Sequence, residues 1–163
     1  MIIKNFEIKN YIDKKNIFLI FGENEGLKED VISEIAKTFT KEITIKYDEK
    51  DILLNPDNFY NNLYSQSFFD DKKLILINNA SDRLKNELEK ILNKKIQGVT
   101  IVLISKILDK KSKLRNFFEK EKDLCCVPVY KDDKRNLLNI AFAFFKSKNL
   151  NISSEAINLI VER

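Results

Sequence analysis

The sequence predicts an α/β fold, with an open and mostly parallel sheet of five strands flanked by helices. Uninterrupted apolar runs at 17–21 and 99–104 indicate strands that are buried on both faces, as in a parallel sheet covered by helices. Between the strand-like runs lie segments whose apolar residues recur at helical spacing. Strand and helix therefore alternate along the chain, which favours crossover connections between parallel strands.

Each element follows from a local signal. Apolar runs or strict alternation predict strands at 16–21, 42–47, 74–77, 99–104 and 124–129. Helical periodicity predicts helices at 6–14, 27–39, 56–66, 82–92, 109–122, 133–148 and 154–163. Residues that cap or begin helices stand at several of the starts: Pro56, Asp82, Asp109, Asp132 or Asp133, and Ser153.

The composition limits the class of protein. The 163 residues suffice for one domain and the start of a second, and a net charge of +4 permits nucleic-acid contact without arguing for it. The sequence has no His, which removes imidazole metal sites and the commonest general base. The adjacent Cys125 and Cys126 cannot form an ordinary disulfide, and we expect them to be small core residues on opposite sheet faces. With no membrane-spanning stretch and no signal-peptide core, we expect a reduced, cytoplasmic protein without membrane contacts.

The turn after the first strand is where a nucleotide-binding protein would hold phosphate. A P-loop has the pattern Gly-x-x-x-x-Gly-Lys-Ser/Thr, in which backbone amides and the Lys surround the phosphates. Here Gly22 and Gly26 are one residue too close, Leu27 stands where the Lys should follow, and Glu29 replaces the hydroxyl. Lys28 comes one position late. We expect this degenerate phosphate loop not to bind nucleotide, and to be a tight turn or a P-loop position that has lost its chemistry.

A second feature of nucleotide hydrolysis is also missing. The third predicted strand ends in Asn78 and Asn79, where a Walker B motif would carry acidic residues. Neither amide is a convincing general base or magnesium ligand. We therefore expect no catalytic residues, no metal site and no cofactor in this chain.

A basic cluster surrounds the start of the predicted helix at 109–122. It consists of Lys106, Lys110, Lys111, Lys113 and Arg115. A solvated helix face explains such a cluster without any function. If it contacts nucleic acid, it does so through the phosphate backbone and does not read sequence.

Phe68 and Phe69 follow the predicted helix at 56–66 and precede a charged turn. Adjacent helical residues point about 100° apart, so both rings rarely face one core. One ring is therefore expected to face solvent or a partner. The alternative is that both rings pack inside and close the core below the helix.

Several stretches resemble one family in its own order: 18–29, 67–75, 103–114, 126–128 and 149–156. The family is the delta subunit of the bacterial DNA polymerase III clamp loader. The resemblance implies an AAA+-like, P-loop-type α/β domain at 1–130 without a functional P-loop. It also implies that 131–163 is a linking helix and the beginning of a helical lid domain, in a chain that is a piece of a longer protein.

The resemblance further implies a role in DNA replication. Ser67, Phe68 and Phe69 match the family element that enters a hydrophobic pocket on the sliding clamp (the beta subunit) and helps to open the ring for loading onto primed DNA. The expected partners are the clamp, other loader subunits in the full-length protein, and primed DNA. No catalysis is expected of the chain itself, although it would belong to a holoenzyme with nucleotidyltransferase activity. Two alternatives stay open: an active AAA+-type ATPase with a divergent phosphate loop, and a DNA-binding domain that contacts phosphates through Lys106, Lys110, Lys111 and Lys113.

Overall fold

The computed structural model describes residues 1–39, 44–65, 72–94 and 98–162. It divides into two compact units, 1–129 and 130–163, which are described separately. The strands of the first unit are β1 (Ile17–Gly22), β2 (Thr44–Asp48), β3 (Lys73–Asn78), β4 (Val99–Ser105) and β5 (Leu124–Val129). Its helices are η1 (Asn5–Asn10, 3₁₀), α1 (Glu25–Ala36), α2 (Glu49–Leu54), α3 (Pro56–Tyr64), η2 (Asp82–Leu84, 3₁₀), α4 (Lys85–Asn93) and α5 (Lys113–Lys120). The second unit contains α6 (Lys134–Ser147) and α7 (Ser154–Val161).

The five strands form one parallel sheet in the order β2-β3-β4-β1-β5, which confirms the predicted fold class. β1 lies between β4 and β5, and in its register Ile17 lies opposite Ile101 of β4 and Leu124 of β5. Pro128 of β5 lies opposite Phe21 of β1, and β5 is an edge strand. A proline is tolerated there because an edge strand has one side that forms no ladder.

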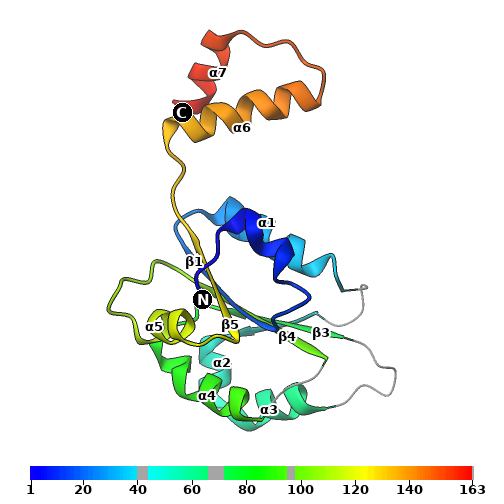
Figure 1. The fold of residues 1–163 in the computed structure, drawn as a ribbon, viewed down its shortest axis with the longest axis vertical. Helices are drawn as coiled ribbons and strands as arrows, with labels where there is room; N and C mark the ends of the chain where they lie inside the picture. The colour runs from blue at the N-terminus through cyan, green and yellow to red at the C-terminus, as the bar shows by residue number, and fades with distance from the viewer. Residues whose placement is uncertain (40–43, 66–71, 95–97, 163) are drawn as a thin grey trace. The chain divides into compact units, whose positions relative to one another are not determined.

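Helices cover both faces of the sheet (Figure 1). α1 and η1 pack on one face, over Phe18, Ile20 and Cys125. α2 to α5 lie on the other face, over side chains that include Leu19 and Cys126. Because successive strand residues point to opposite faces, a continuous apolar run serves both layers. The two cysteines are fully buried on opposite faces, as predicted, and burial raises the pKa of the Cys126 thiol to about 12.

The N-terminal helix differs from its prediction. The segment expected as an amphipathic helix at 6–14 forms only the 3₁₀ helix η1, with Ile8 buried and Phe6 71% exposed. With three residues per turn, a 3₁₀ helix directs a different set of side chains to the core than an α-helix does. Phe6 therefore lies outside the core that its spacing had suggested.

Two helix boundaries move because of capping side chains. α1 begins at Glu25, two residues before the predicted start, because Asn24 Oδ1 accepts a hydrogen bond from the Leu27 amide at 3.0 Å. α2 was not expected from the sequence, and it begins where Asp48 Oδ1 accepts from the Lys50 amide at 3.1 Å. Six residues are too few to show a clear helical period, so only the cap marked this helix.

Other predicted starts and ends can be compared with the described residues. Pro56 occupies the first turn of α3, as predicted, and α3 is described to Tyr64, with Gln66 outside the described residues. The predicted caps Asp82 and Asp109 are wrong: Ser81 caps η2, and Ser112 caps α5. Asp109 Oδ1 instead accepts from the amides of Lys111 at 2.7 Å and Ser112 at 3.0 Å, and the Asp82 carboxylate bonds to residues at the start of α5.

The second unit consists of α6 and α7. Asp133 caps α6 by accepting from the Asn136 amide at 2.7 Å, and Ser153 caps α7 by accepting from the Ala156 amide at 3.2 Å, as predicted. Lys134 Nζ lies 2.7 Å from Glu162 Oε1 and joins the two helices. Ile157 is buried, whereas no residue of α6 is. In the described chain, no helix combines the length and the apolar character that crossing a lipid bilayer requires.

Candidate functional site

The carboxyl ends of the parallel strands meet at one edge of the sheet, where ligands of such folds are held. The turn after β1 begins there at Gly22. The Gly22 amide donates to the carbonyl of Lys106, which follows β4, at 3.2 Å, and the Glu23 amide donates to the carbonyl of Val129 in β5 at 3.2 Å. These are amides of the kind that a P-loop directs at phosphate. Here they are bonded to neighbouring segments instead.

Gly22 is required at this point by space as well as by conformation. Its φ is +144°, and a Cβ placed on it would lie 1.8 Å from the Val129 carbonyl oxygen. The turn is therefore pressed against β5. A phosphate group has no room between them unless the backbone moves.

The lysine at the start of α1 is already paired within its own helix. Lys28, the residue nearest to a P-loop lysine, has a side chain only 3% exposed, and its Nζ lies 2.8 Å from Glu25 Oε1. Gly26 lies in the first turn of α1, and a Cβ there would meet only Asn24 Oδ1, at 3.6 Å. Lys28 is thus committed to a carboxylate of its own helix, and Gly26 makes no close approach that needs a glycine.

The side-chain amide of Asn79, which follows β3, has a structural partner. Asn79 adopts φ +56° and donates from Nδ2 to Asp48 Oδ2 at 2.5 Å. That hydrogen bond is the main reason why the pKa of Asp48 lies below its ordinary value. Asn79 therefore links the ends of two adjacent strands, β3 and β2.

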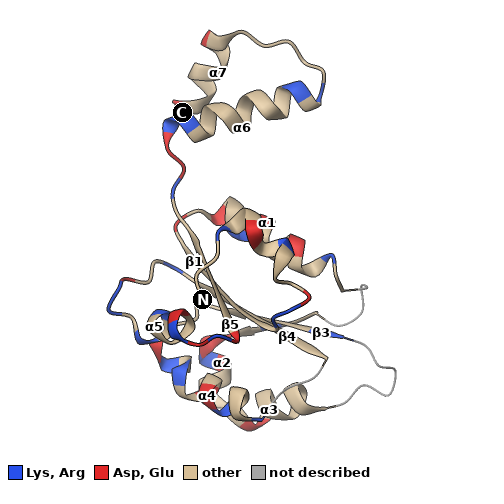
Figure 2. Cartoon of the chain, viewed as in Figure 1, with Lys and Arg blue, Asp and Glu red and all other residues tan. Residues whose placement is uncertain are grey.

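The predicted basic cluster lies at the carboxyl-terminal ends of the strands, beside the turn after β1. The side chains of Lys106, Lys110, Lys111 and Lys113 are exposed, and none of them makes an ion pair with the described residues. Figure 2 shows their blue segments in and beside the loop that leads into α5. The bond between the Gly22 amide and the Lys106 carbonyl brings the degenerate phosphate loop and this cluster together.

Arg115 differs from the four lysines of the cluster. Its Nε lies 2.6 Å from Glu119 Oε1, its Nη1 donates to the Leu108 carbonyl at 3.0 Å, and its guanidinium lies 5.1 Å from the centre of the Phe21 ring. The guanidinium is therefore engaged within the protein. Arg115 therefore helps to hold α5 in place, whereas the four lysines of the cluster are exposed.

The proposed clamp-contact residues Ser67, Phe68 and Phe69 lie outside the described residues. Both flanks are described: α3 ends at Tyr64, followed by Ser65, and β3 begins at Lys73. The choice between exposed and buried rings at 68 and 69 therefore stays a prediction.

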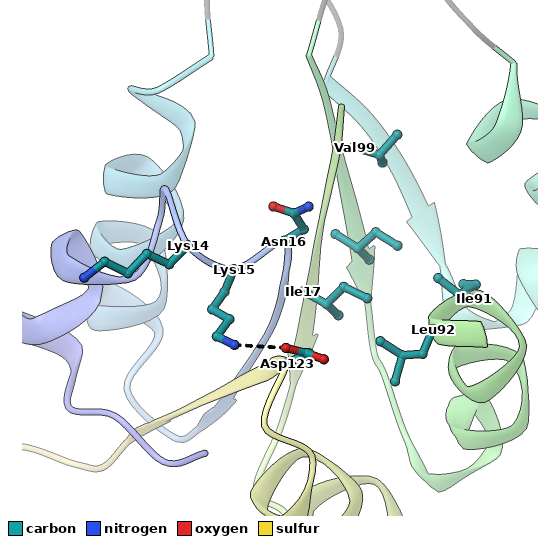
Figure 3. Close-up of a pocket in the computed structure, with 9 residues that line it drawn as sticks. Lys14, Lys15, Asn16, Ile17, Ile91, Leu92, Val99 and Asp123 are labelled. Atoms are coloured by element: carbon teal, nitrogen blue, oxygen red, sulfur yellow. Dashed lines mark hydrogen bonds and ion pairs between the residues drawn. The ribbon is translucent and has the colours of Figure 1, made fainter. Parts of the chain in front are cut away.

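A cavity of about 220 Å³, which the sequence did not suggest, lies near the amino-terminal ends of the strands, opposite the end where the turn after β1 lies. Ile17 at the start of β1 and Leu92 of α4 line its apolar side, and Asn16, Lys15 and Asp123 line its polar side (Figure 3). Lys15 Nζ lies 3.2 Å from Asp123 Oδ1. Two of the charged residues that line the cavity, Lys15 and Asp123, are thus paired with each other. Asn16 and Asp123 immediately precede the adjacent parallel strands β1 and β5. These positions in the sequence could have indicated that the two residues lie close together.

Two classes of site have no support in the part of the chain that is described. No group of three or more His, Cys, Asp or Glu side chains there could hold a metal ion. The buried thiol of Cys125 has a pKa raised by burial, which disfavours the reactive thiolate.

The strand order β2-β3-β4-β1-β5 and the helices on both faces of the sheet define an AAA+-like fold, and solved structures show the same fold. The Bacillus subtilis DNA clamp loader delta protein YqeN aligns with a TM-score of 0.66 and 16% identity, over 96% of this chain and 51% of that one. A replication initiator DnaA bound to AMPPCP and single-stranded DNA aligns with a TM-score of 0.57 and 19% identity, over 95% of this chain and 54% of that one. At these identities the likeness shows the fold alone.

The sequence gives the family. A family model described as DNA polymerase III, delta subunit, matches residues 18–129, so the chain belongs to the DNA polymerase III delta-subunit family. This confirms the resemblance seen in the sequence. No curated protein sequence matches significantly. The chain spans about half the length of the B. subtilis protein (51%).

Proposed function

We propose that this chain acts in DNA replication as the clamp-contacting, non-catalytic part of a clamp loader. The main observation that supports this proposal is the delta-subunit match over 18–129, which includes Ser67, Phe68 and Phe69 between α3 and β3. In this proposal the two rings enter an apolar pocket on the sliding clamp. Burying two such side chains contributes on the order of 3–5 kcal/mol by area. To help open the ring, the segment must fit the open clamp interface better than the closed one.

The turn after β1 supports the non-catalytic part of the proposal. The Gly22 and Glu23 amides donate to carbonyls, and Lys28 is paired with Glu25. An active ATPase with a divergent loop would have to break these bonds before phosphate could bind. Saturable, magnesium-dependent binding of fluorescent ATP at micromolar concentration would contradict the proposal and favour the ATPase alternative.

The remaining partners are proposed for the full-length protein. They are the other loader subunits and primed DNA, with nucleotidyltransferase activity belonging to the holoenzyme and not to this chain. We also propose the division into an α/β domain at 1–130 and the beginning of a helical lid domain at 131–163. The separation of compact units after Val129 supports it.

A capture experiment with the sliding clamp of the same organism tests the proposal. The chain should retain the clamp, and Phe68→Ala with Phe69→Ala should abolish retention while leaving the far-ultraviolet CD spectrum and the melting temperature unchanged. Phe142→Ala with Phe144→Ala is the matched control, because these rings are 46% and 55% exposed in α6. If the Phe68/Phe69 variant unfolds, the rings belong to the core and the clamp-contact assignment fails.

One observation favours a second function, contact with the DNA backbone. Lys106, Lys110, Lys111 and Lys113 present exposed ammonium groups at one edge of the sheet, and none is ion-paired within the described chain. Such groups bind phosphates without reading bases. This contact is compatible with clamp binding, because it uses a different part of the chain.

A further inference from the structure

The loop between β4 and α5, residues 106–112, bears three of the four exposed lysines of the basic cluster, and the fourth, Lys113, begins α5. The loop contains no helix or strand of its own. None of the four lysines is ion-paired within the described chain, so their charges repel one another. A loop of this composition keeps one conformation only if bonds to other parts of the protein hold it.

Four carbonyls of this loop, at every second position, accept hydrogen bonds from donors outside it. They belong to Lys106, Leu108, Lys110 and Ser112. The donors are, in that order, the Gly22 amide at 3.2 Å, Arg115 Nη1 at 3.0 Å and, for the last two carbonyls, Asn116 Nδ2 at 2.9 and 2.8 Å. The loop is thus fixed along its whole length to β1 and α5.

Asn116 holds the part of the loop where two lysines are adjacent. Its side-chain nitrogen donates to two carbonyls and so uses both of its hydrogens. The bond to the Ser112 carbonyl lies at the start of α5, whereas the bond to the Lys110 carbonyl reaches out of the helix into the loop. Asn116 therefore ties the turn at Lys110 and Lys111 to α5.

Asp109 is the single carboxylate in the sequence from 106 to 113, and it also holds the turn. Its Oδ1 accepts from the Lys111 amide at 2.7 Å and from the Ser112 amide at 3.0 Å, as in an Asx turn. The carboxylate forms no ion pair with a lysine among the described residues. The turn is thus fixed by its own carboxylate and by Asn116, while its ammonium groups stay available to an external anion.

A fixed backbone under exposed lysines affects how they bind a polyanion. Lysines on a mobile loop attract DNA by charge, but each contact with a phosphate then costs conformational entropy. Lysines on a loop that is already ordered lose less entropy when several of them contact phosphates together. A neutral residue that orders the loop can therefore strengthen DNA binding without adding charge.

We propose that Asn116 is a positioning residue for contact with the DNA backbone, which holds the turn at Lys110 and Lys111 so that both ammonium groups meet the phosphates of a duplex together. This inference rests on the proposed contact with the DNA backbone. Asn116 itself needs no contact with DNA, because both hydrogens of its amide are bonded within the protein.

The first test measures the affinity of the 163-residue chain for a fluorescent DNA duplex by anisotropy at several salt concentrations. Asn116→Ala removes the amide, keeps the net charge and suits a helix, and it should weaken binding by about fivefold. It should also lower the salt slope, because fewer phosphates are neutralised at once. Asn86→Ala, at an exposed position of α4, is the matched control and should stay within about twofold of wild type.

A double-mutant cycle asks whether Asn116 acts through the two lysines. In a chain that carries Lys110→Gln and Lys111→Gln, the further change Asn116→Ala should weaken DNA binding by less than about twofold. A role in general stability would leave the effect of Asn116→Ala undiminished in that background. Such an undiminished effect would overturn the positioning role.

The third test needs no DNA. In amide hydrogen exchange, Asn116→Ala should accelerate exchange of the Lys111 amide by about fivefold, while the amides of β4 and β5 keep their protection. Faster exchange in the strands as well would indicate general destabilisation and would count against the proposal. If Asn116→Ala does not fold, Asn116→Ser carries the same expectations. Its hydroxyl can bond to the carbonyl four residues earlier, at Ser112, but is too short for the Lys110 carbonyl.

The outcomes distinguish this inference from the function on which it rests. If wild type does not bind the duplex, the contact with the DNA backbone fails and the positioning role fails with it. If wild type binds and Asn116→Ala binds equally well with the same salt slope, only the positioning role is overturned. Charge alone would then explain the DNA contact.

Discussion

Asp82 Oδ1 accepts a hydrogen bond from the Ser112 hydroxyl at 2.6 Å, across 30 residues of sequence. The same oxygen accepts from the Leu114 amide at 2.9 Å, while Ser112 Oγ accepts from the Arg115 amide at 3.1 Å. Asp82 and Ser112 together thus satisfy two free amides at the start of α5. They fix the helix that follows the lysine-bearing loop.

Removing the Asp82 carboxylate should destabilise the first unit. Asp82→Ala leaves the Leu114 amide and the Ser112 hydroxyl without this acceptor and should lower the free energy of unfolding by about 1–2 kcal/mol. Asp82→Asn keeps an oxygen acceptor and should recover more than half of the loss. Urea denaturation followed by CD measures both. Asp30→Ala, at an exposed carboxylate of α1, should change stability by less than about 0.5 kcal/mol.

The same carboxylate gives stability a dependence on acid pH. Desolvation is the largest influence and acts to raise the pKa of Asp82, but the hydrogen bonds from Leu114 and Ser112 outweigh it and hold that pKa below its ordinary value of 3.8. A lowered pKa means that the stabilisation is present above pH 3.8 and is lost as pH falls through the folded-state pKa. The difference in stability between wild type and Asp82→Ala should therefore shrink below about pH 4. A constant difference would show that the charge is not involved.

The two glycines of the degenerate phosphate loop should respond in opposite directions to alanine. Gly22→Ala places a Cβ 1.8 Å from the Val129 carbonyl oxygen at φ +144° and should cost about 3 kcal/mol or more. Gly26→Ala meets no close atom inside α1 and should raise stability by about 0.5–1 kcal/mol. Thermal and urea unfolding measure both. Similar effects at the two positions would contradict the packing of the turn against β5.

Tyr60 should make stability sensitive to alkaline pH. Burial, followed by the hydrogen bond to Glu87, raises the pKa of Tyr60 above its ordinary value of 10. Because the folded-state pKa is raised, the stabilisation is complete below pH 10 and is lost as pH rises through the folded-state pKa. Tyr60→Phe should lower stability by about 1 kcal/mol at neutral pH and make the alkaline decline shallower. Tyr130→Phe, at a ring 63% exposed, is the control and should leave the decline unchanged.

The exposed lysines should contribute to DNA affinity through charge alone. Lys110→Gln with Lys111→Gln should weaken binding to duplexes of different sequence equally, and should reduce the salt slope by up to about 0.9 per lysine that contacts a phosphate. Fluorescence anisotropy at several salt concentrations measures this. Lys120→Gln with Lys122→Gln removes the same charge near the other end of α5 and should have a smaller effect. Equal effects would indicate general electrostatic attraction without a defined face.

Local signals predicted those features of the fold that depend on a few neighbouring residues. Continuous apolar runs located β1 and β4, and the caps Asp133 and Ser153 located α6 and α7. The sequence predicted Asp82 as a helix cap, whereas Ser81 caps η2. An Asp before a periodic segment indicates a cap even when its carboxylate bonds to another helix, as Asp82 does to the start of α5. α2 was missed because its six residues are too short for a periodic pattern.

By itself, the sequence determined the α/β class, the family, and the departure from the P-loop pattern around Gly22, because these depend on residue identity and on spacing along the chain. Only the tertiary structure decided which strands are neighbours, that the Gly22 amide is bonded to the Lys106 carbonyl, and that Lys73 caps the end of α3. The physical reason is that a hydrogen bond depends on distance in space. Parallel strands bring together residues from distant parts of the chain, and no local pattern records that proximity.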